Sequence, residues 1–79
     1  METKLGNAIR ARRKKLGLSI EELAKKIKTH RTYISKIENQ GFIPSDKLMG
    51  KIVKGLDAPT LIKIYLTEKH TEILKKSKN

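Results

Sequence analysis

The apolar residues of this chain recur at helical spacing in short stretches, and Gly and Pro separate one stretch from the next. No stretch shows the sustained apolar–polar alternation that a strand with one buried face requires. The pattern therefore predicts an all-α, compact domain of five helices. The expected helices span about 3–16, 20–27, 31–39 and 46–54, and a fifth opens at 57–59.

The first two helices have clear end signals. Leu5, Ile9 and Leu16 form one apolar stripe, and Gly17 follows it as a natural C-terminal cap. A capping box at residues 19–22 then predicts the start of the second helix, because Ser and Glu at this spacing each bond the other residue's backbone.

The later boundaries depend on single residues. Gly55 is expected just after the fourth helix, and Pro59 is tolerated in the first turn of the fifth. The sequence leaves open whether the fifth helix runs unbroken to about residue 76 or breaks near 69–70. Residues 77–79 are expected to fray.

Length and composition exclude several protein classes. The chain has 79 residues, which indicates a single domain, 1–79, and it contains no Cys, so disulfides and thiolate zinc sites are excluded. No apolar run approaches the roughly 20 residues that span a membrane. The first residues lack the apolar core of a signal peptide, so we expect a cytoplasmic protein with no membrane partner.

The charge balance indicates the kind of partner. Lys and Arg number 19 against 8 Asp and Glu, so the formal net charge is +11, and the excess is spread along the whole chain. Such a surface favours a polyanion, nucleic acid first and anionic lipid second. The alternative is a basic surface that only keeps the protein soluble.

Two charges fall on faces that should be apolar. The stripe of the first helix continues through Arg13, and the stripe of the third helix, from Ile34 and Ile37, continues through Glu38. A buried charge without a partner is costly, so we expect Arg13 and Glu38 to pair and to tie the two helices together. The alternative is that both reach solvent at the edge of the stripe.

The second and third helices have the lengths and the short turn of a DNA-reading helix pair. Ala24 lies where the two helices would cross, and a small side chain there allows close approach. The outward side of the third helix carries donors that suit bases and phosphates, whereas the acidic residues 21–22 are expected to lie away from it. These donors are Arg31, Thr32, Ser35, Lys36 and Asn39.

At this point the residues resemble a known family. Residues 4–57 look like the phage-repressor/Cro-type, or XRE-type, helix-turn-helix domain, and residues 58–79 then form a C-terminal helix and basic tail. The matching fragments are residues 13–19 ending in Gly-Leu-Ser, Glu-Leu-Ala at 22–24, Tyr-Ile-Ser-Lys-Ile-Glu at 33–38, Pro-Ser at 44–45 and residues 51–56. The resemblance implies a lambda-repressor-like fold and a core pair between Arg13 and Glu38.

The resemblance also implies which residues contact DNA. Its base-reading positions correspond to Arg31, Thr32 and Lys36, with His30, Tyr33 and Ser35 beside them. Its phosphate contacts correspond to Ser19, Ile20 and Asn39. Arg and Lys suit the two acceptors of guanine, and Thr suits a thymine methyl group or a phosphate. Tyr33 could equally pack at the edge of the core.

Three residues depart from the family pattern. Ile20 replaces a common Gln, so one side-chain anchor to phosphate is missing. Lys28 stands where the turn usually has Gly, which costs about 1 kcal/mol if the residue is left-handed. His30 replaces the usual Ser or Thr cap, so Thr29 is expected to cap the third helix.

These features together predict a sequence-specific regulator of transcription that binds a double-stranded DNA operator as a homodimer. It would read the major groove with residues 31–38, as a repressor or an autoregulatory controller of the phage, restriction–modification or antitoxin type. The fifth helix has more apolar residues than one face needs, so a dimer interface is expected there. Its residues are Leu61, Ile62, Tyr65 and Leu66.

Two readings from other classes compete with a regulator. One is a bridging co-regulator that uses a helix-turn-helix to dock proteins, and the other is a cationic coat for any nucleic acid or anionic membrane. An enzyme is not expected, because His30 and His70 have no metal-ligand spacing and no Gly-rich phosphate loop is present. We expect no metal, no cofactor and no small-molecule ligand.

Overall fold

The computed structural model describes residues 3–76, with side chains as far as residue 74. This part of the chain forms five helices and has no strand, which confirms the predicted all-α class. The expected fraying of residues 77–79 lies outside the described residues. The helices are α1 (Lys4–Lys15), α2 (Ile20–Lys26), α3 (Arg31–Gln40), α4 (Asp46–Leu56) and α5 (Leu61–Lys76).

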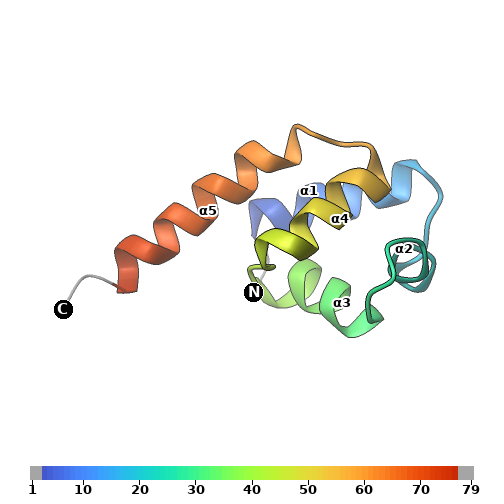
Figure 1. Ribbon diagram of the computed structural model, residues 1–79, viewed down its shortest axis with the longest axis horizontal. Coiled ribbons are helices and arrows are strands. Elements are labelled where there is room, and N and C mark those ends of the chain that lie inside the picture. The colour runs from blue at the N-terminus through green and yellow to red at the C-terminus, as the bar shows by residue number, and fades with distance from the viewer. Residues whose placement is uncertain (1–2, 77–79) are drawn as a thin grey trace.

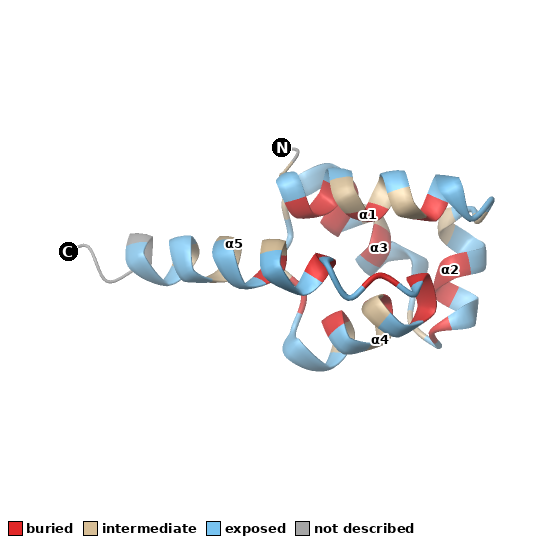
Figure 2. Ribbon diagram, turned by 90° about the horizontal axis from the view of Figure 1, so that it is seen from above, coloured by how far each residue is buried: buried red, intermediate tan, exposed pale blue. Residues whose placement is uncertain are grey.

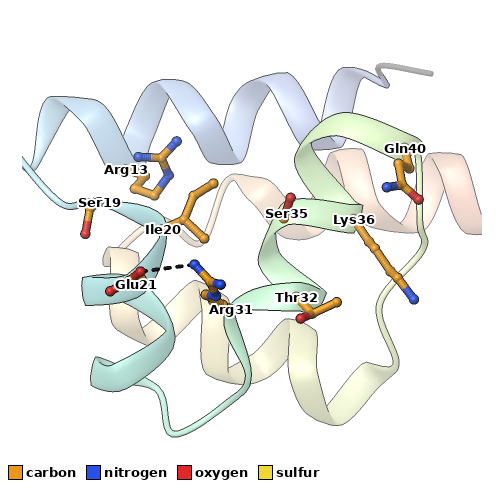
Figure 3. Close-up of a pocket in the computed structure, with 9 residues that line it drawn as sticks. All are labelled: Arg13, Ser19, Ile20, Glu21, Arg31, Thr32, Ser35, Lys36 and Gln40. Atoms are coloured by element: carbon orange, nitrogen blue, oxygen red, sulfur yellow. Dashed lines mark hydrogen bonds and ion pairs between the residues drawn. The ribbon is translucent and has the colours of Figure 1, made fainter.

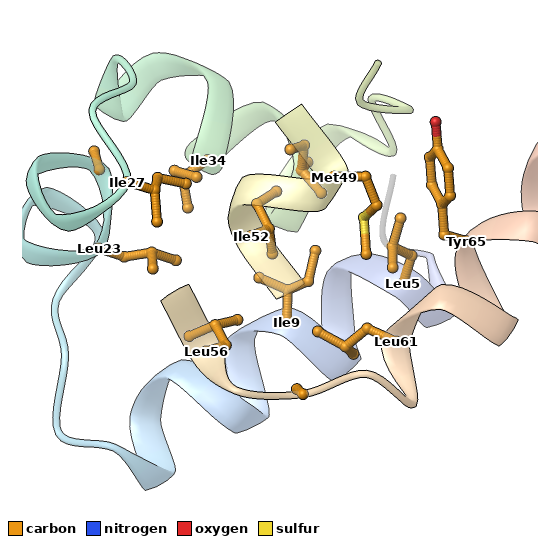
Figure 4. Packing of buried hydrophobic residues seen from close by; sticks show 13 residues of the cluster. Leu5, Ile9, Leu23, Ile27, Ile34, Met49, Ile52, Leu56, Leu61 and Tyr65 are labelled. Carbon is orange, nitrogen blue, oxygen red and sulfur yellow. The ribbon is translucent and has the colours of Figure 1, made fainter. Parts of the chain in front are cut away.

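The first four helices gather around one core, and α5 packs on α1 and α4 with its first turns before it projects away (Figure 1). Every helix contributes to the core, which is built almost entirely from aliphatic side chains (Figure 4). Its fully buried residues include Leu5, Ile9, Leu23, Ile34, Ile37, Ile52 and Leu56. The projecting part of α5 gives the molecule a long axis of 42 Å against 22 and 20 Å.

The end of α1 differs from the sequence prediction in one respect. Gly17 has a φ of +72°, the left-handed conformation that favours Gly after a helix. Leu16, however, is 42% exposed, so its expected place on the buried stripe is wrong. The helix ends at Lys15, and Leu16 follows it as the C-cap residue, with its amide still bonded to the Arg12 carbonyl.

The end of α4 is also corrected. Gly55 lies inside the helix and is buried, not beyond its end. A Cβ at this position would clash with the Ile27 side chain, so the missing side chain lets α4 approach α2 closely. The left-handed residue that ends the helix is Asp57, with a φ of 49°.

The fifth helix is continuous from Leu61 to Lys76, which settles the alternative of a break near 69–70. Pro59 lies before the helix and not in its first turn: the Leu61 and Ile62 amides donate to the Ala58 and Pro59 carbonyls in a tight turn. The expected opening at 57–59 is therefore too early, because Asp57 and Ala58 still bond the end of α4.

Polar contacts dock the first half of α5. The Tyr65 hydroxyl lies 2.8 Å from the Pro44 carbonyl oxygen and 2.6 Å from Asp46 Oδ1. Lys69 Nζ donates to the same Asp46 oxygen at 2.6 Å, and the Leu5 amide donates to Glu68 Oε1 at 2.6 Å. Because Asp46 is the first residue of α4 and Leu5 lies in the first turn of α1, these bonds hold α5 against two other helices.

Two residues predicted at a dimer interface lie inside the chain instead. Leu61 is 4% exposed and Tyr65 is 3% exposed, and both belong to the core. Their prediction as partner contacts is wrong, because α5 uses this face to cover α1 and α4. Ile62 and Leu66, farther around the helix toward solvent, are 44% and 56% exposed.

Candidate nucleic-acid interface

The recognition candidate α3 is bounded by a cap at each end. The His30 Nδ1 atom accepts a hydrogen bond from the Thr32 amide at 3.2 Å, so His30 itself caps the helix. The expectation that Thr29 would cap is wrong, because the imidazole ring reaches the free amide directly. At the other end, Gly41 adopts the left-handed conformation with a φ of 71°.

A buried ion pair holds α3 against α1. Arg13 Nε and Nη2 donate to the two carboxylate oxygens of Glu38, each at 2.8 Å, and Arg13 Nη1 donates to the Leu18 carbonyl at 2.8 Å. Glu38 is fully buried and Arg13 is 7% exposed. The hydrogen bond with Glu38 raises the pKa of Arg13 above its ordinary value. Burial alone would lower this pKa, and the bond outweighs it. The structure thus joins the two charges that the sequence placed on apolar faces.

Arg10 extends this contact toward the surface, and the sequence analysis did not select it. Its Nε donates to Glu38 Oε1 at 3.3 Å, and its Nη2 donates to the Glu38 carbonyl at 3.2 Å and to Asn39 Oδ1 at 2.5 Å. Its position three residues before Arg13, on the same side of α1, was the available signal. Asn39, a predicted phosphate contact, is exposed and joined to α1 by this bond.

Arg12 has a different structural role on the same helix. Its Nε donates to the Leu56 carbonyl at 2.8 Å, and its Nη2 donates to the Asp57 carbonyl at 3.2 Å. These are carbonyls at the end of α4, which have no partner within that helix. Arg10, Arg12 and Arg13 therefore all bind protein groups, so these three side chains are less available to phosphate than the net charge of the chain indicates.

Local hydrogen bonds fix both ends of α2, including the short turn that leads to α3. The capping box of α2 is present, with Ser19 Oγ accepting from the Glu22 amide at 3.0 Å and the Ser19 amide donating to Glu22 Oε1 at 2.9 Å. These bonds lower the pKa of Glu22. Ala24 is buried between the two helices, and its carbonyl accepts from the Thr29 amide. Lys28 adopts the left-handed conformation, with a φ of 57°.

The outer side of α3 faces a surface hollow of about 810 Å³ between it and the start of α2 (Figure 3). Arg31, Thr32 and Lys36 are exposed there, and Ser35 is half-buried. The hollow therefore gathers six of the predicted DNA contacts, from the start of α2 and from α3. Its lining residues are Arg13, Ser19, Ile20, Glu21, Arg31, Thr32, Ser35, Lys36 and Gln40.

The structure places one acidic residue, Glu21, beside this face. The expectation that residues 21–22 lie away from it is therefore wrong for Glu21. Its Oε1 atom lies 3.1 Å from Arg31 Nη1, so an acidic group from α2 reaches the start of α3 (Figure 3). The helical angles within α3 could not reveal this contact, because it depends on the crossing of α2 and α3. Both side chains remain largely exposed.

Tyr33 lies at the border of the outer face rather than in the core. It is 46% exposed, and its ring stacks on Phe42 with 6.3 Å between the ring centroids. Phe42 is itself 40% exposed and comes from the loop after α3. The sequence reasoning did not select Phe42, because nothing in the spacing places this loop residue against α3.

Comparison with known proteins decides the family. A helix-turn-helix family model, HTH_3, matches residues 9–62. The chain belongs to this helix-turn-helix family. It is of the XRE/Cro-C1 type, as the sequence fragments predicted, and the match spans the ion pair, the hollow and the first two residues of α5. Families of this kind bind DNA and are typically not enzymes.

One curated relative of this helix-turn-helix protein is the ImmF control region 10 kDa protein of Bacillus phage phi105. The two sequences are 43% identical over 49 residues, which are 62% of this chain and 54% of the relative. The chain thus matches about half the length of that relative. No solved structure gives a significant match to this chain.

Two further findings concern the described part of this helix-turn-helix protein. No helix among residues 3–76 is long and apolar enough to cross a membrane. Among the same residues, no cluster of three or more His, Asp or Glu side chains is arranged to hold a metal ion.

Proposed function

We propose that this helix-turn-helix protein is a sequence-specific regulator of transcription that reads the major groove of operator DNA with residues 31–38. The observation that carries the proposal is the exposed set of Arg31, Thr32 and Lys36 on the outer side of α3. A buried ion pair and caps at both ends hold this helix in one orientation. Exposed donors on a rigid helix are the requirement for reading base edges.

The polar side chains of this face suit the groups that DNA presents. Arg31 and Lys36 can donate to guanine, and Thr32 can contact a thymine methyl group or a phosphate. Ser35, Tyr33 and His30 flank them, although the His30 ring already caps the helix. The Ser19 hydroxyl accepts a bond within α2 and can still donate to a phosphate, while Ile20 offers only its backbone amide. Asn39 completes the proposed phosphate contacts.

We also propose that the functional unit is a homodimer in the cytoplasm. One α3 covers one half-site, and two copies related by a two-fold axis would read a palindrome with recognition helices about 34 Å apart. The second copy would cover exposed apolar residues of α5, with the interface moved from Leu61 and Tyr65 to the adjacent exposed side. These residues are Ile62, Leu66, Ile73 and Leu74. The likeness to a phage control-region protein favours a repressor or autoregulatory controller.

Selection from a pool of random duplex DNA tests the reading of sequence. The wild-type chain should enrich one near-palindromic motif, and Lys36→Ala should lose about 1–3 kcal/mol on that motif and almost nothing on random DNA. A bridging co-regulator or a non-specific cationic coat would enrich no motif. That result would overturn the proposal.

The assembly has its own test. Replacing Ile62 and Leu66 with Glu should leave the fold intact, because both side chains are exposed, but should yield a monomer with much weaker operator binding. Thr67→Glu adds one negative charge to an exposed position of α5 and serves as the control. Sedimentation of the double variant identical to that of the wild type would remove this face as the interface.

A further inference from the structure

An exposed ion pair lies within the proposed DNA-reading face. Arg31 Nη1 is 3.1 Å from Glu21 Oε1, and 67% and 72% of the two side chains are exposed. Glu21 is the one carboxylate among the described residues that line the hollow between α2 and α3 (Figure 3). A negative charge is unfavourable on a surface that approaches phosphates, so its position beside Arg31 calls for a physical explanation.

We propose that Glu21 is a specificity-determining residue that acts through Arg31. Its carboxylate offsets the charge that Arg31 would otherwise present to any phosphate, and it holds the guanidinium in a position from which it can read a base. Glu21 therefore weakens binding to random DNA more than binding to the operator. This inference rests on the proposed function.

The geometry of the pair leaves Arg31 able to read a base. A guanidinium has five N–H donors, and the bond to Glu21 uses the Nη1 end. The Nε and Nη2 donors remain for the two major-groove acceptors of guanine. Glu21 stands in the first turn of α2, within the capping box at residues 19–22, so its backbone is fixed relative to α3. The carboxylate thus limits the directions that the long Arg31 side chain can take.

The electrostatics explain the effect on random DNA. Binding to any duplex is driven by the release of counterions, with a slope of about −0.9 in log–log salt plots for each phosphate neutralised. An Arg paired with a carboxylate contributes little net charge to this term. Without Glu21, Arg31 becomes an additional free cation that can bind the nearest phosphate whatever the sequence. The ratio of operator affinity to random affinity then falls.

The test uses Glu21→Gln, Arg31→Ala and the double variant, on random duplex DNA and on the motif that the wild-type chain selects. Glu21→Gln should bind random DNA about threefold to tenfold more tightly near 0.15 M salt, with a salt slope steeper by up to about 0.9. The selected motif should gain less. In the Arg31→Ala background, Glu21→Gln should change neither quantity.

A matched control separates this mechanism from a general change of charge. Asp57→Asn removes the same charge from an exposed residue outside the hollow, where Asn tolerates the left-handed backbone, and it should leave the salt slope unchanged. Thermal melts of all variants should stay close to the wild type, because an exposed pair adds little stability.

Two results would overturn the inference. One is a Glu21→Gln variant with unchanged affinity and slope on random DNA. The other is equal tightening by Glu21→Gln with and without Arg31, which would reveal simple repulsion of phosphates. Failure of the proposed function is distinguishable: the wild-type chain would then select no motif, while the random-DNA measurements would still report whether Glu21 offsets the charge of Arg31.

Discussion

Residues 4–57 and the part of α5 beyond Tyr65 differ in how far their side chains are buried. Residues 4–57 bury one face of every helix, and at α3 a charged pair is buried as well. Beyond Tyr65, no side chain of α5 as far as residue 74 is buried (Figure 2). The helix-turn-helix unit therefore fixes its own geometry, whereas the end of α5 leaves apolar side chains in water.

This difference shows which contacts restrict the domain to one packing arrangement. The aliphatic core drives folding but accepts several packings of similar volume. The Arg13–Glu38 pair is satisfied in one arrangement only, because both carboxylate oxygens and the Leu18 carbonyl must be reached together. The side chains of α5 from residue 66 to residue 74 are exposed or half-buried, so burial does not fix the end of this helix in the same way.

The largest effect is expected from breaking the buried pair. Glu38→Ala should destabilise the fold by about 3–5 kcal/mol, because Arg13 would be left buried without its partner. Urea or thermal unfolding measures this loss. Glu21→Ala breaks an exposed pair of the same chemical type and should cost less than about 1 kcal/mol. A Glu38→Ala melt within a degree or two of the wild type would contradict the comparison.

The next prediction contrasts two Leu residues of α5. Leu61→Ala should cost about 2–5 kcal/mol, since the side chain is 4% exposed and its loss leaves a cavity. Leu66→Ala should change stability by less than about 0.5 kcal/mol, since Leu66 is 56% exposed. Both are measured by unfolding at concentrations where the wild-type chain is monomeric. Equal losses would show that both faces of α5 are structural.

A smaller effect is expected where α1 and α3 approach most closely. A Cβ on Gly6 would lie 2.5 Å from the Ile37 carbonyl oxygen, so Gly6→Ala should destabilise by about 1–3 kcal/mol. Gly50 lies in α4 with open space around it, and Gly50→Ala should stabilise by about 0.5–1 kcal/mol. The signs of the two changes in unfolding free energy must differ if the packing is as described.

The smallest effect concerns the polar docking of α5 and depends on pH. The bonds from Lys69 and then from Tyr65 lower the pKa of Asp46 below its ordinary value of 3.8. Because the folded-state pKa is the lower one, this contribution to stability is complete above pH 3.8 and is lost as the pH falls through the lowered value. The melting difference between wild type and Asp46→Asn should therefore be constant near neutrality and shrink in strong acid. A difference that persists at pH 2 would exclude this role.

Much of the fold followed from local pattern. The five helices, the Ser19 capping box and the Gly17 end could be predicted, because periodicity and caps act within a few residues. The Arg13–Glu38 contact could also be predicted, although 25 residues separate its partners. Both charges fell on apolar stripes, and burial makes a partner necessary. The polar outer side of α3 followed from the same helical angles.

Tertiary structure decided the features that depend on how helices dock. Arg10, Arg12 and Glu21 looked like solvated charges along the chain, and only the crossing of helices supplied their partners at Glu38, Leu56 and Arg31. Local pattern showed that α5 was apolar but not which face it would bury. The buried face of α5 is set by the surface on which the helix docks, at α1 and at the start of α4. There Glu68, Tyr65 and Lys69 bond the Leu5 amide, the Pro44 carbonyl and Asp46, in that order. The sequence by itself determined that five helices form and that each carries apolar residues, because periodicity and caps act locally. Which face a helix buries is set by the neighbour that docks on it.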